Sequence, residues 1–234
     1  KRFFSQVELL RFSYTCQQPA KVILIPHGDY FGSYPESSLD VRQKYGIAPD
    51  EPLVLFLGAI RPYKNIELLI RNFPVGRATL LICGGVRPAG YLRKLQECIS
   101  VSEDGVKNKV ILAPDFVPDD DLSAYVRAAS FLVAPYSYDS ALNSGTVLLA
   151  CSYGKTMVCP DIAGVQDIQN QADCLYAYHY ETPAEHGAEL ARALNRALDD
   201  AQSGELAVKE ARTLEYMHKN SWQAHSSEWC GLYR

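Results

Sequence analysis

Residues 52–65, "PLVLFLGAIRPYKN", place an apolar run directly before two cations. The run from 52 to 60 shows no alternation of polar and apolar residues, which is typical of a strand buried on both faces of a parallel sheet. Gly58, Arg61 and Lys64 lie at its carboxyl end. Ligands of open α/β sheets bind beyond the carboxyl ends of the strands. We therefore expect these cations to lie beside a ligand.

Similar apolar runs recur along the chain, and segments with helical spacing separate them. Further strands are predicted at 78–85, 109–116, 130–137 and 155–161. Helices are predicted at 65–73, 89–101, 120–129 and 144–154, followed by a pair within 185–216 that separates near Ser203-Gly204. This alternation predicts an α/β fold with a Rossmann-like, doubly wound parallel sheet.

Net charge and cysteine content narrow the class of ligand. The 234 residues carry a formal net charge of −4, and the pI is about 5.8, so broad binding to nucleic acid is not expected. The seven cysteines include no CxxC pair, which argues against a zinc site. Several cysteines lie inside apolar runs, and this usage suits a reducing cytoplasm.

Arg61 and Lys64 are three positions apart, so both side chains can reach one anion if a helix begins near Tyr63. Arginine offers a planar fork of donors and lysine a mobile point charge, and this combination suits a diphosphate. The spacing alone leaves open the alternative that both side chains are solvated loop charges.

The stretch "NSGTVLLA", which begins at Asn143, adds a second feature to the same predicted edge of the sheet. Asn143 or Ser144 suits the N-cap of a helix, and Gly145 lets a ligand approach the backbone. Free N–H groups and the helix dipole favour an anion at such a position. An ordinary capped helix is the alternative.

Other residues give weaker signals. His27 follows a predicted strand at 21–28, and a structural role is the simpler interpretation. Tyr136 and Tyr138 are most simply aromatic residues at the rim of the sheet, although one could face a sugar or a base. The chain contains no GxGxxG, GxxxxGK[ST], GxSxG or HExxH motif. The residues alone therefore indicate an α/β domain with a phosphate-bearing ligand.

Three segments, taken in order, resemble the C-terminal domain of glycosyltransferase family 4, a group of enzymes with the GT-B fold. They are "VLFLGAIRPYKNIELLIRNF" from Val54, "ILAPDFVPDDDLSAYVRAASFLVAPY" from Ile111 and "NSGTVLLACSYGKTMVCPDIAGVQDI" from Asn143. A fourth segment, "VILIPHGDYF" from Val22, resembles the one that leads from the N-terminal domain into that C-terminal domain. The match covers roughly residues 21–230. The resemblance implies that this chain is the C-terminal, donor-binding half of a GT-B fold, and that an N-terminal domain faces it across a cleft.

The resemblance also implies a division of the chain. Residues 1–30 would be a remnant of the N-terminal domain and the strand that leads from it, and 31–51 a linker. Residues 52–215 would form the nucleotide-sugar-binding domain, and 216–234 a closing helix.

The implied function is sugar transfer. A hexosyltransferase of this family would move a sugar from a UDP- or GDP-sugar to a glycan or lipid-linked acceptor, with retention and without a metal or other cofactor. The implied location is the cytoplasm, with peripheral association at the inner face of the membrane through the N-terminal half. The isolated donor half is expected to bind nucleotide but to transfer little sugar.

Roles of individual residues are carried over by position. The resemblance implies that Arg61 and Lys64 grip the donor diphosphate and act in catalysis. The implied binding region for the donor's base is Phe116 and Val117. The other implied donor-binding positions are Gly58, Asn143, Ser144, Gly145 and Thr146. The candidates for the cleft or the acceptor side are His27, Tyr136 and Asp139.

One departure from the family pattern concerns a pair of glutamates that many members carry in this loop. The corresponding positions here hold Ala141 and Leu149, and Asp139 lies near the first of them. What binds the ribose is therefore left open. We do not interpret the departure as a loss of activity, because the "NSG" form resembles a subgroup that lacks the pair.

Two other functions are compatible with these patterns. A GT-B-like nucleotide-sugar epimerase would need acid/base carboxylates and a histidine in the cleft, and the sequence singles out no such set. A non-catalytic nucleotide-binding module would use Arg61 for a partner protein rather than for a nucleotide.

Overall fold

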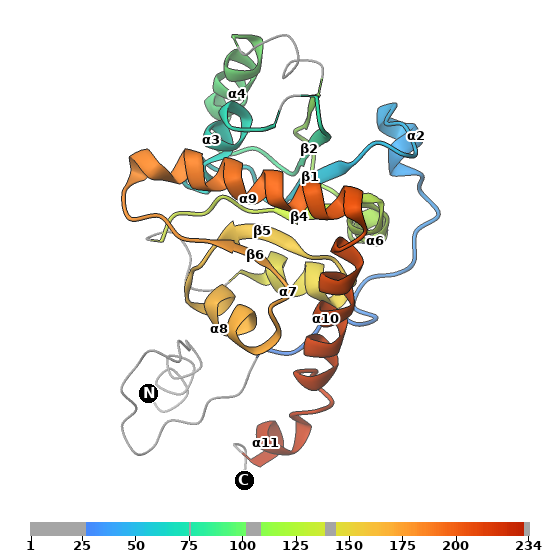
Figure 1. The fold of residues 1–234 in the computed structure, drawn as a ribbon. Coiled ribbons are helices and arrows are strands. Elements are labelled where there is room, and N and C mark those ends of the chain that lie inside the picture. Colours follow the sequence, from blue (N-terminus) through green and yellow to red (C-terminus); the bar gives the residue numbers. More distant parts are fainter. Residues whose placement is uncertain (1–26, 75, 102–108, 139–143, 232–234) are drawn as a thin grey trace, which may run out of the picture.

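The computed structural model describes residues 27–74, 76–101, 109–138 and 144–231. A sheet of six parallel strands forms its centre (Figure 1). The strands are β1 (Leu53–Leu57), β2 (Thr79–Cys83), β3 (Val110–Ala113), β4 (Phe131–Val133), β5 (Met157–Pro160) and β6 (Tyr176–Tyr178). Their order in the sheet is β3-β2-β1-β4-β5-β6. The predicted doubly wound α/β fold is therefore confirmed.

Helices cover both faces of the sheet (Figure 1). One face carries α3 (Ile66–Arg71), α4 (Gly90–Ser100) and α9 (Pro183–Ser203). The other carries α2 (Val41–Tyr45), α6 (Asp119–Ala128), α7 (Gly145–Ser152), α8 (Ala163–Ala172) and α10 (Leu206–Lys219). A short helix, α11 (Ser226–Gly231), ends the described part of the chain.

Strand β1 shows why the apolar run lacks alternation. All five of its residues are buried. Leu53, Leu55 and Leu57 pack into the core beneath α6 and α7, whereas Val54 and Phe56 pack into the core beneath α3 and α9. Each fully buried side chain of this kind contributes about 1.5–3 kcal/mol relative to an exposed one. A polar residue on either face would therefore destabilise the sheet.

The sheet has one switch point, which lies between β1 and β4. The chain leaves β1 toward β2 on one side and leaves β4 toward β5 on the other, so the loops after β1 and β4 diverge. Crevices at such switch points are the usual ligand sites of open α/β sheets. The loops that flank this one are residues 58–65 and the described part of the segment between β4 and α7.

Several predicted boundaries differ from the structure. The predicted linker at 31–51 contains helix α2, and the boundary predicted after residue 215 falls inside α10. Strand β6 and helix α8 were not predicted. Both are short, and the helix has an almost equal balance of apolar and polar residues. The strand predicted at 21–28 lies mostly outside the described residues, and His27 and Gly28 are not in a strand.

The segment after α10 returns to the segment that precedes α2. The backbone N–H of Trp222 donates to Asp29 Oδ2 at 3.0 Å, and its indole N–H donates to the Asp29 carbonyl at 2.8 Å. The indole also covers Gly28, where a Cβ atom would lie 2.2 Å from the ring. Asp29 is buried. These contacts fasten the two ends of the described chain to each other.

None of the helices in the described ranges has the length and apolar character needed to span a lipid bilayer.

Candidate functional site at the strand ends

Two glycines bring the loops after β1 and β2 into direct backbone contact. Gly58 has φ 129° and Gly84 has φ 143°, a conformation that favours glycine. A Cβ atom on Gly84 would lie 2.0 Å from the carbonyl oxygen of Gly58. The Gly58 N–H also donates to the Cys83 carbonyl at 3.0 Å. This contact leaves space above the end of β1.

Lys64 extends its side chain into this space. Its ammonium nitrogen lies 3.4 Å from the position that a Cβ atom on Gly58 would take. The same nitrogen lies 5.4 Å from the centroid of the Tyr136 ring and 5.8 Å from that of Phe56. Burial lowers the pKa of Lys64, and the nearby charge of Arg61 lowers it further, whereas Tyr63 opposes the change. Lys64 is thus a partly desolvated cation above two aromatic rings.

Arg61 and Lys64 have no ion-pair partner among the described residues. In the part of the chain that the structure describes, no carboxylate forms an ion pair with either residue. A desolvated charge is costly unless an opposite charge or hydrogen-bond acceptors compensate it. The partial burial of Lys64 therefore argues against the alternative of a freely solvated loop charge.

The local backbone confirms the helix prediction but not the condition attached to the two cations. The helix predicted at 65–73 begins at Ile66, after a 3₁₀ turn at Pro62–Lys64, and so not near Tyr63. Asn65 separates the two and adopts the left-handed conformation, with φ 54°. Arg61 has an extended backbone before the turn. The cations therefore lie on a loop and a 3₁₀ turn, and not on the first turn of α3.

Asn65 joins the two loops that flank the crevice. Its side-chain amide donates to the Pro135 carbonyl at 2.9 Å and to Ser137 Oγ at 2.8 Å. These bonds hold the loop that carries Lys64 against the loop that follows β4. Sequence reasoning missed this residue, although asparagine is one of the few residues that tolerate the left-handed conformation.

The start of α7 faces the same space. Ser144 occupies the N-cap position, as predicted, but its hydroxyl makes no capping bond and instead lies 3.4 Å from the Tyr136 hydroxyl. Thr146 Oγ1 lies 4.0 Å from the Cβ position on Gly58. At Gly145, a Cβ atom would lie 3.1 Å from the Tyr30 hydroxyl. The first turn of α7 thus presents backbone N–H groups without a side-chain cap, close to Lys64.

The remaining predicted residues divide by exposure. Phe116 is 74% exposed just after β3, whereas Val117 is buried in the core. Tyr136 was expected in the cleft, but it is only 4% exposed, and its ring lies beneath the ammonium of Lys64. His27 is exposed, and its ring centroid lies 5.1 Å from that of Trp222. Asn143 and Asp139 lie outside the described residues.

A polar cluster at the ends of β4, β5 and β6 was also missed. The Tyr138 hydroxyl donates to Asp161 Oδ1 and lies 3.0 Å from His179 Nδ1. His179 Nδ1 lies 3.1 Å from Asp161 Oδ2. Asp161 follows β5 and His179 follows β6. The sequence predicted Tyr138 at the rim and Asp161 at the end of a strand, but it gave no signal for His179, because β6 was not predicted.

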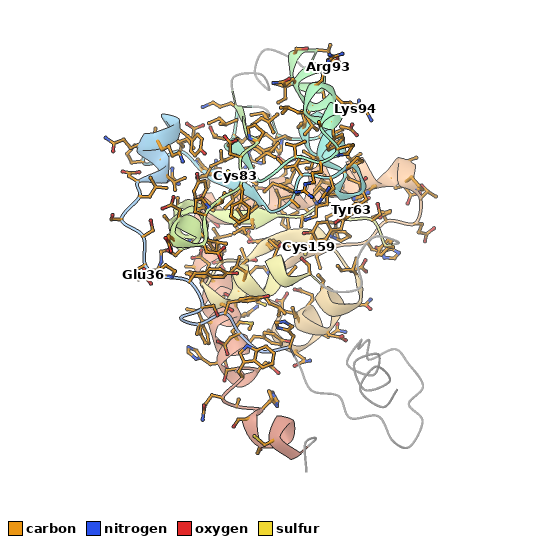
Figure 2. The ribbon with its side chains drawn as sticks, turned by 180° about the vertical axis from the view of Figure 1, so that it is seen from behind. Glu36, Tyr63, Cys83, Arg93, Lys94 and Cys159 are labelled. Carbon is orange, nitrogen blue, oxygen red and sulfur yellow. The ribbon has the colours of Figure 1, made fainter. Side chains whose placement is uncertain are left out.

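Figure 2 labels one side chain on the loop after β1, Tyr63, and two on the strands of the sheet, Cys83 and Cys159. Tyr63 is 53% exposed on the loop after β1, whereas Cys83 and Cys159 are buried. Burial raises the pKa of the Cys83 thiol to about 12, although Tyr45 and Lys44 oppose this shift. Such a thiol is a poor nucleophile. Within the described ranges, no cluster of three or more His, Cys, Asp and Glu side chains could hold a metal ion.

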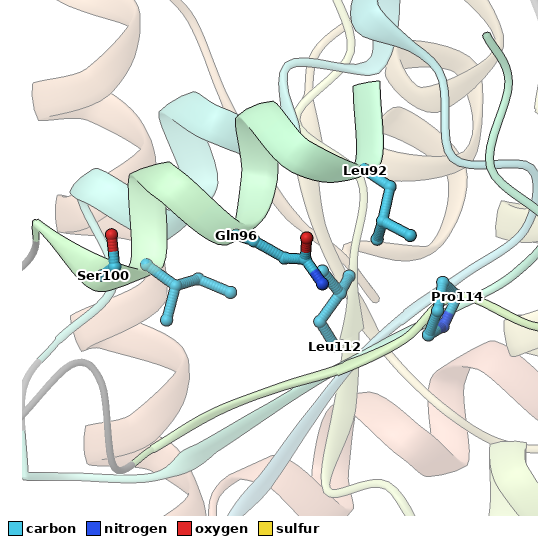
Figure 3. A pocket seen from close by; sticks show the side chains of 6 residues that line it. Leu92, Gln96, Ser100, Leu112 and Pro114 are labelled. Atoms are coloured by element: carbon cyan, nitrogen blue, oxygen red, sulfur yellow. The ribbon is translucent and has the colours of Figure 1, made fainter. Parts of the chain in front are cut away.

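A separate pocket of about 410 Å³ lies between α4 and β3 (Figure 3). Its lining side chains carry no charge; they are Leu92, Gln96, Ile99, Ser100, Leu112 and Pro114. A diphosphate needs cations or N–H groups. This pocket is therefore not the anion site.

Sequence comparison gives a family match. The chain matches the model described as "Glycosyl transferases group 1" over residues 51–200. It is 28% identical to an uncharacterized glycosyltransferase of Methanocaldococcus jannaschii over 85% of this chain and 49% of the relative. The identity to the D-inositol 3-phosphate glycosyltransferase of Nocardia farcinica is also 28%, over 89% and 46%. O-antigen chain mannosyltransferase B of Escherichia coli is 24% identical over 99% and 58%.

Solved structures share the fold. The sucrose-phosphate synthase of Thermosynechococcus elongatus superposes with a TM-score of 0.75 at 22% identity, over 98% of this chain and 56% of that one. HepE of Anabaena in complex with UDP superposes with a TM-score of 0.71 at 19% identity, over 92% of this chain and 58% of that one. The C-terminal domain of LpcC from Francisella tularensis superposes with a TM-score of 0.62 at 15% identity, over 82% of this chain and 97% of that one. The chain spans about half the length of the curated relatives it matches.

Proposed function

Because the chain belongs to the group 1 glycosyl transferases, we propose that it is the donor-binding half of a family 4 glycosyltransferase. The observation that carries the proposal is the partly buried ammonium of Lys64, which lies close to the uncapped start of α7 at the switch point. A nucleoside diphosphate supplies the negative charge that this arrangement lacks. The proposed donor is a UDP- or GDP-sugar, and the bound UDP of the Anabaena relative supports the first of these.

The other moieties of the donor follow from the strand order. Phe116 lies at the end of β3, on the side of β1 away from β4, and its exposed ring offers a stacking surface for the base. Val117 contributes backbone only, because its side chain is in the core. Gly58 allows the donor to lie close to the end of β1.

In the proposed reaction, the sugar leaves the diphosphate and negative charge builds on the departing phosphate. Arg61, Lys64 and the N–H groups of Ser144 and Gly145 would stabilise that charge without reorganisation. Removal of one such group typically costs about 10²–10³ in rate. The proposed transfer retains the configuration of the sugar and uses no metal. Asn143 and Thr146 would support the phosphate contacts.

Acceptor binding is proposed for a second domain, across a cleft from the strand ends. His27 and Asp139 are candidates on this side of that cleft. A glycan or lipid-linked acceptor is consistent with the names of relatives such as the O-antigen chain mannosyltransferase. On this proposal the 234-residue chain alone transfers little sugar, because the second wall that positions the acceptor and excludes water is not part of it.

Calorimetry tests the donor site. Wild-type chain, Arg61→Ala, Lys64→Met and the control Lys94→Met would be titrated with UDP, GDP and ADP. Lys94 is exposed on α4 and pairs with Glu67. We expect one nucleotide to bind, and Lys64→Met to weaken it about 10- to 100-fold, as for a lost charge-assisted hydrogen bond. Equal affinities of Lys64→Met and Lys94→Met would exclude Lys64 from the site.

One observation favours the alternative of a nucleotide-sugar epimerase. That reaction needs acid/base carboxylates and a histidine, and Asp161 and His179 form such a pair. An assay for free sugar released or inverted from a nucleotide sugar separates the two enzymes. If the protein is a non-catalytic module, Arg61→Ala should alter the binding of a partner protein and leave the affinity for nucleotide unchanged.

A further inference from the structure

The cluster of Tyr138, Asp161 and His179 has a fixed geometry. Because a carboxylate only accepts hydrogen bonds, the contacts of His179 Nδ1 with Asp161 assign a proton to that nitrogen. In the neutral ring, Nε2 is then an acceptor, and it lies on the side of the ring away from the carboxylate. The side chain of His179 is 66% exposed and that of Asp161 is 21% exposed. The cluster therefore presents an oriented ring nitrogen to solvent.

An aromatic stack supports the cluster from below. The Tyr138 ring stacks on Tyr180 with centroids 4.6 Å apart, and Tyr180 stacks on His186 at 4.0 Å with an interplanar angle of 7°. His186 Nε2 is hydrogen-bonded to the Tyr178 hydroxyl at 2.9 Å. Both His186 and Tyr180 are buried. The polar groups, which lie on loops at the strand ends, thus rest on a buried aromatic stack.

The cluster is continuous with the anion site. Asn65, which follows Lys64, donates to Ser137, and Tyr138 is the next residue along the chain. The strand order places the ends of β5 and β6 on one side of the switch point and the ends of β2 and β3 on the other. A nucleotide sugar carries its base and its sugar at opposite ends of the diphosphate. With the base at Phe116, the sugar would extend toward β5 and β6.

We propose that Tyr138, Asp161 and His179 form a subsite that binds hydroxyl groups of the donor's sugar, an inference that rests on the proposed function. His179 Nε2 accepts a hydrogen bond from one sugar hydroxyl. The exposed part of the Asp161 carboxylate accepts from a neighbouring one. Tyr138 positions both, because its hydroxyl contacts Asp161 and His179 together.

A comparison of paired ligands tests the subsite. Each of UDP, UDP-glucose, GDP and GDP-mannose would be titrated calorimetrically into wild-type chain, His179→Gln, Asp161→Asn and Tyr138→Phe. His218→Gln is the matched control, because His218 is an exposed histidine on α10 whose ring, like that of His179, contacts an aromatic residue, here Phe31. The readout is the ratio of the affinity for the nucleotide sugar to that for the corresponding diphosphate. Thermal unfolding of each variant is measured in parallel.

We expect His179→Gln and Asp161→Asn to lower this ratio about 3- to 10-fold, as for one lost hydrogen bond, with diphosphate affinity unchanged within about 2-fold. The control should leave the ratio unchanged. Unaltered ratios in all three variants, with or without a lower melting temperature, would overturn the subsite and leave only a structural tie between loops. Failure of folded wild-type chain to bind any nucleotide would remove the proposed function and the subsite together.

Discussion

The ammonium of Lys64 lies over the rings of Phe56 and Tyr136, in space that the absence of a side chain at Gly58 leaves open. Its charge is thus partly removed from water without an internal counter-ion among the described residues. A single residue of this kind both weakens the isolated fold slightly and prepares it to bind an anion. The neighbouring glycines leave the space that Lys64 occupies, and Asn65 anchors its loop to the loop after β4. A separate prediction follows from each of these features.

Gly84→Ala should destabilise the protein strongly, whereas Gly85→Ala should not. A Cβ atom on Gly84 meets the Gly58 carbonyl oxygen at 2.0 Å, and no heavy atom lies within 4 Å of one on Gly85. We expect the free energy of unfolding to fall by about 3 kcal/mol or more in the first variant and by less than about 1 kcal/mol in the second. Denaturant unfolding of both variants measures the difference. Equal stabilities would contradict the close approach of the two loops.

Asn65→Ala should lower both stability and nucleotide affinity, and Asn65→Gly should separate the two effects. Alanine is strained by about 1–2 kcal/mol at φ 54°, whereas glycine is not. Both variants lose the bonds to Pro135 and Ser137, worth about 0.5–1.5 kcal/mol each. We expect similar losses of affinity by calorimetry, but a larger loss of stability for alanine. Wild-type affinity in Asn65→Gly would show that the tie between the loops does not position Lys64.

At the scale of elements, the helices and strands could largely be predicted because the sheet is buried on both faces. The apolar runs that became β1 to β5 are continuous, and the helix that was expected to stop near Ser203-Gly204 does stop there, with Gly204 in the left-handed conformation. Strand β6 spans only three residues, too few to show a period, and α8 has as many polar as apolar residues, so no apolar run marked either element. The missed β6 concealed the polar cluster, since His179 follows that strand.

Helix α9 makes the stability of the protein depend on pH. Burial lowers the pKa of His186 to about 4 from 6.5. Because the pKa is lower in the folded state, the unfolded chain takes up a proton first as the pH falls. The corresponding stability is fully present above about pH 6.5 and is lost between pH 6.5 and 4, by no more than about 3 kcal/mol.

Unfolding by urea at a series of pH values from about 7.5 to about 4.5 measures this slope. We expect His186→Gln to reduce the slope over that interval, and His218→Gln, a change at an exposed position, to leave it as in the wild type. A slope that is the same in wild type and His186→Gln would mean that another group governs the acid side.

At the scale of the whole molecule, the two ends of the described chain meet at Asp29. Its carboxylate accepts from the backbone N–H groups of Phe31 at 2.8 Å and Trp222 at 3.0 Å. Asp29→Ala should remove the carboxylate acceptor of both groups and release the segment after α10. Amide hydrogen exchange should become faster at Trp222 and Phe31, while Leu55 in β1 keeps its protection.

Asp40→Ala is the matched control for this change, because Asp40 caps only α2 through the Gln43 N–H at 2.9 Å. It should accelerate exchange in α2 and not at Trp222. Unchanged exchange at Trp222 in Asp29→Ala would show that the indole packing on Gly28 holds the segment without the carboxylate.

The candidate site could be predicted in part. The carboxyl ends of parallel strands meet at one edge, so the order of the apolar runs is enough to predict that the cations of one loop lie near the start of α7. Burial of the Tyr136 ring, the tie through Asn65 and the pairing of Asp161 with His179 depend on which side chains meet across loops. Sequence spacing carries no such information, and only the folded arrangement reveals these features.

The most direct test of the central claim is an NMR titration of ¹⁵N-labelled chain with the nucleoside diphosphate that binds in calorimetry. A diphosphate between Lys64 and α7 predicts saturable shifts of the Gly145 and Thr146 amides, and their loss in Lys64→Met but not in Lys94→Met. A second, polar pocket lies at the opposite ends of the strands and is lined in part by Arg42 and Lys155. Shifts confined to the residues around that pocket would contradict the claim.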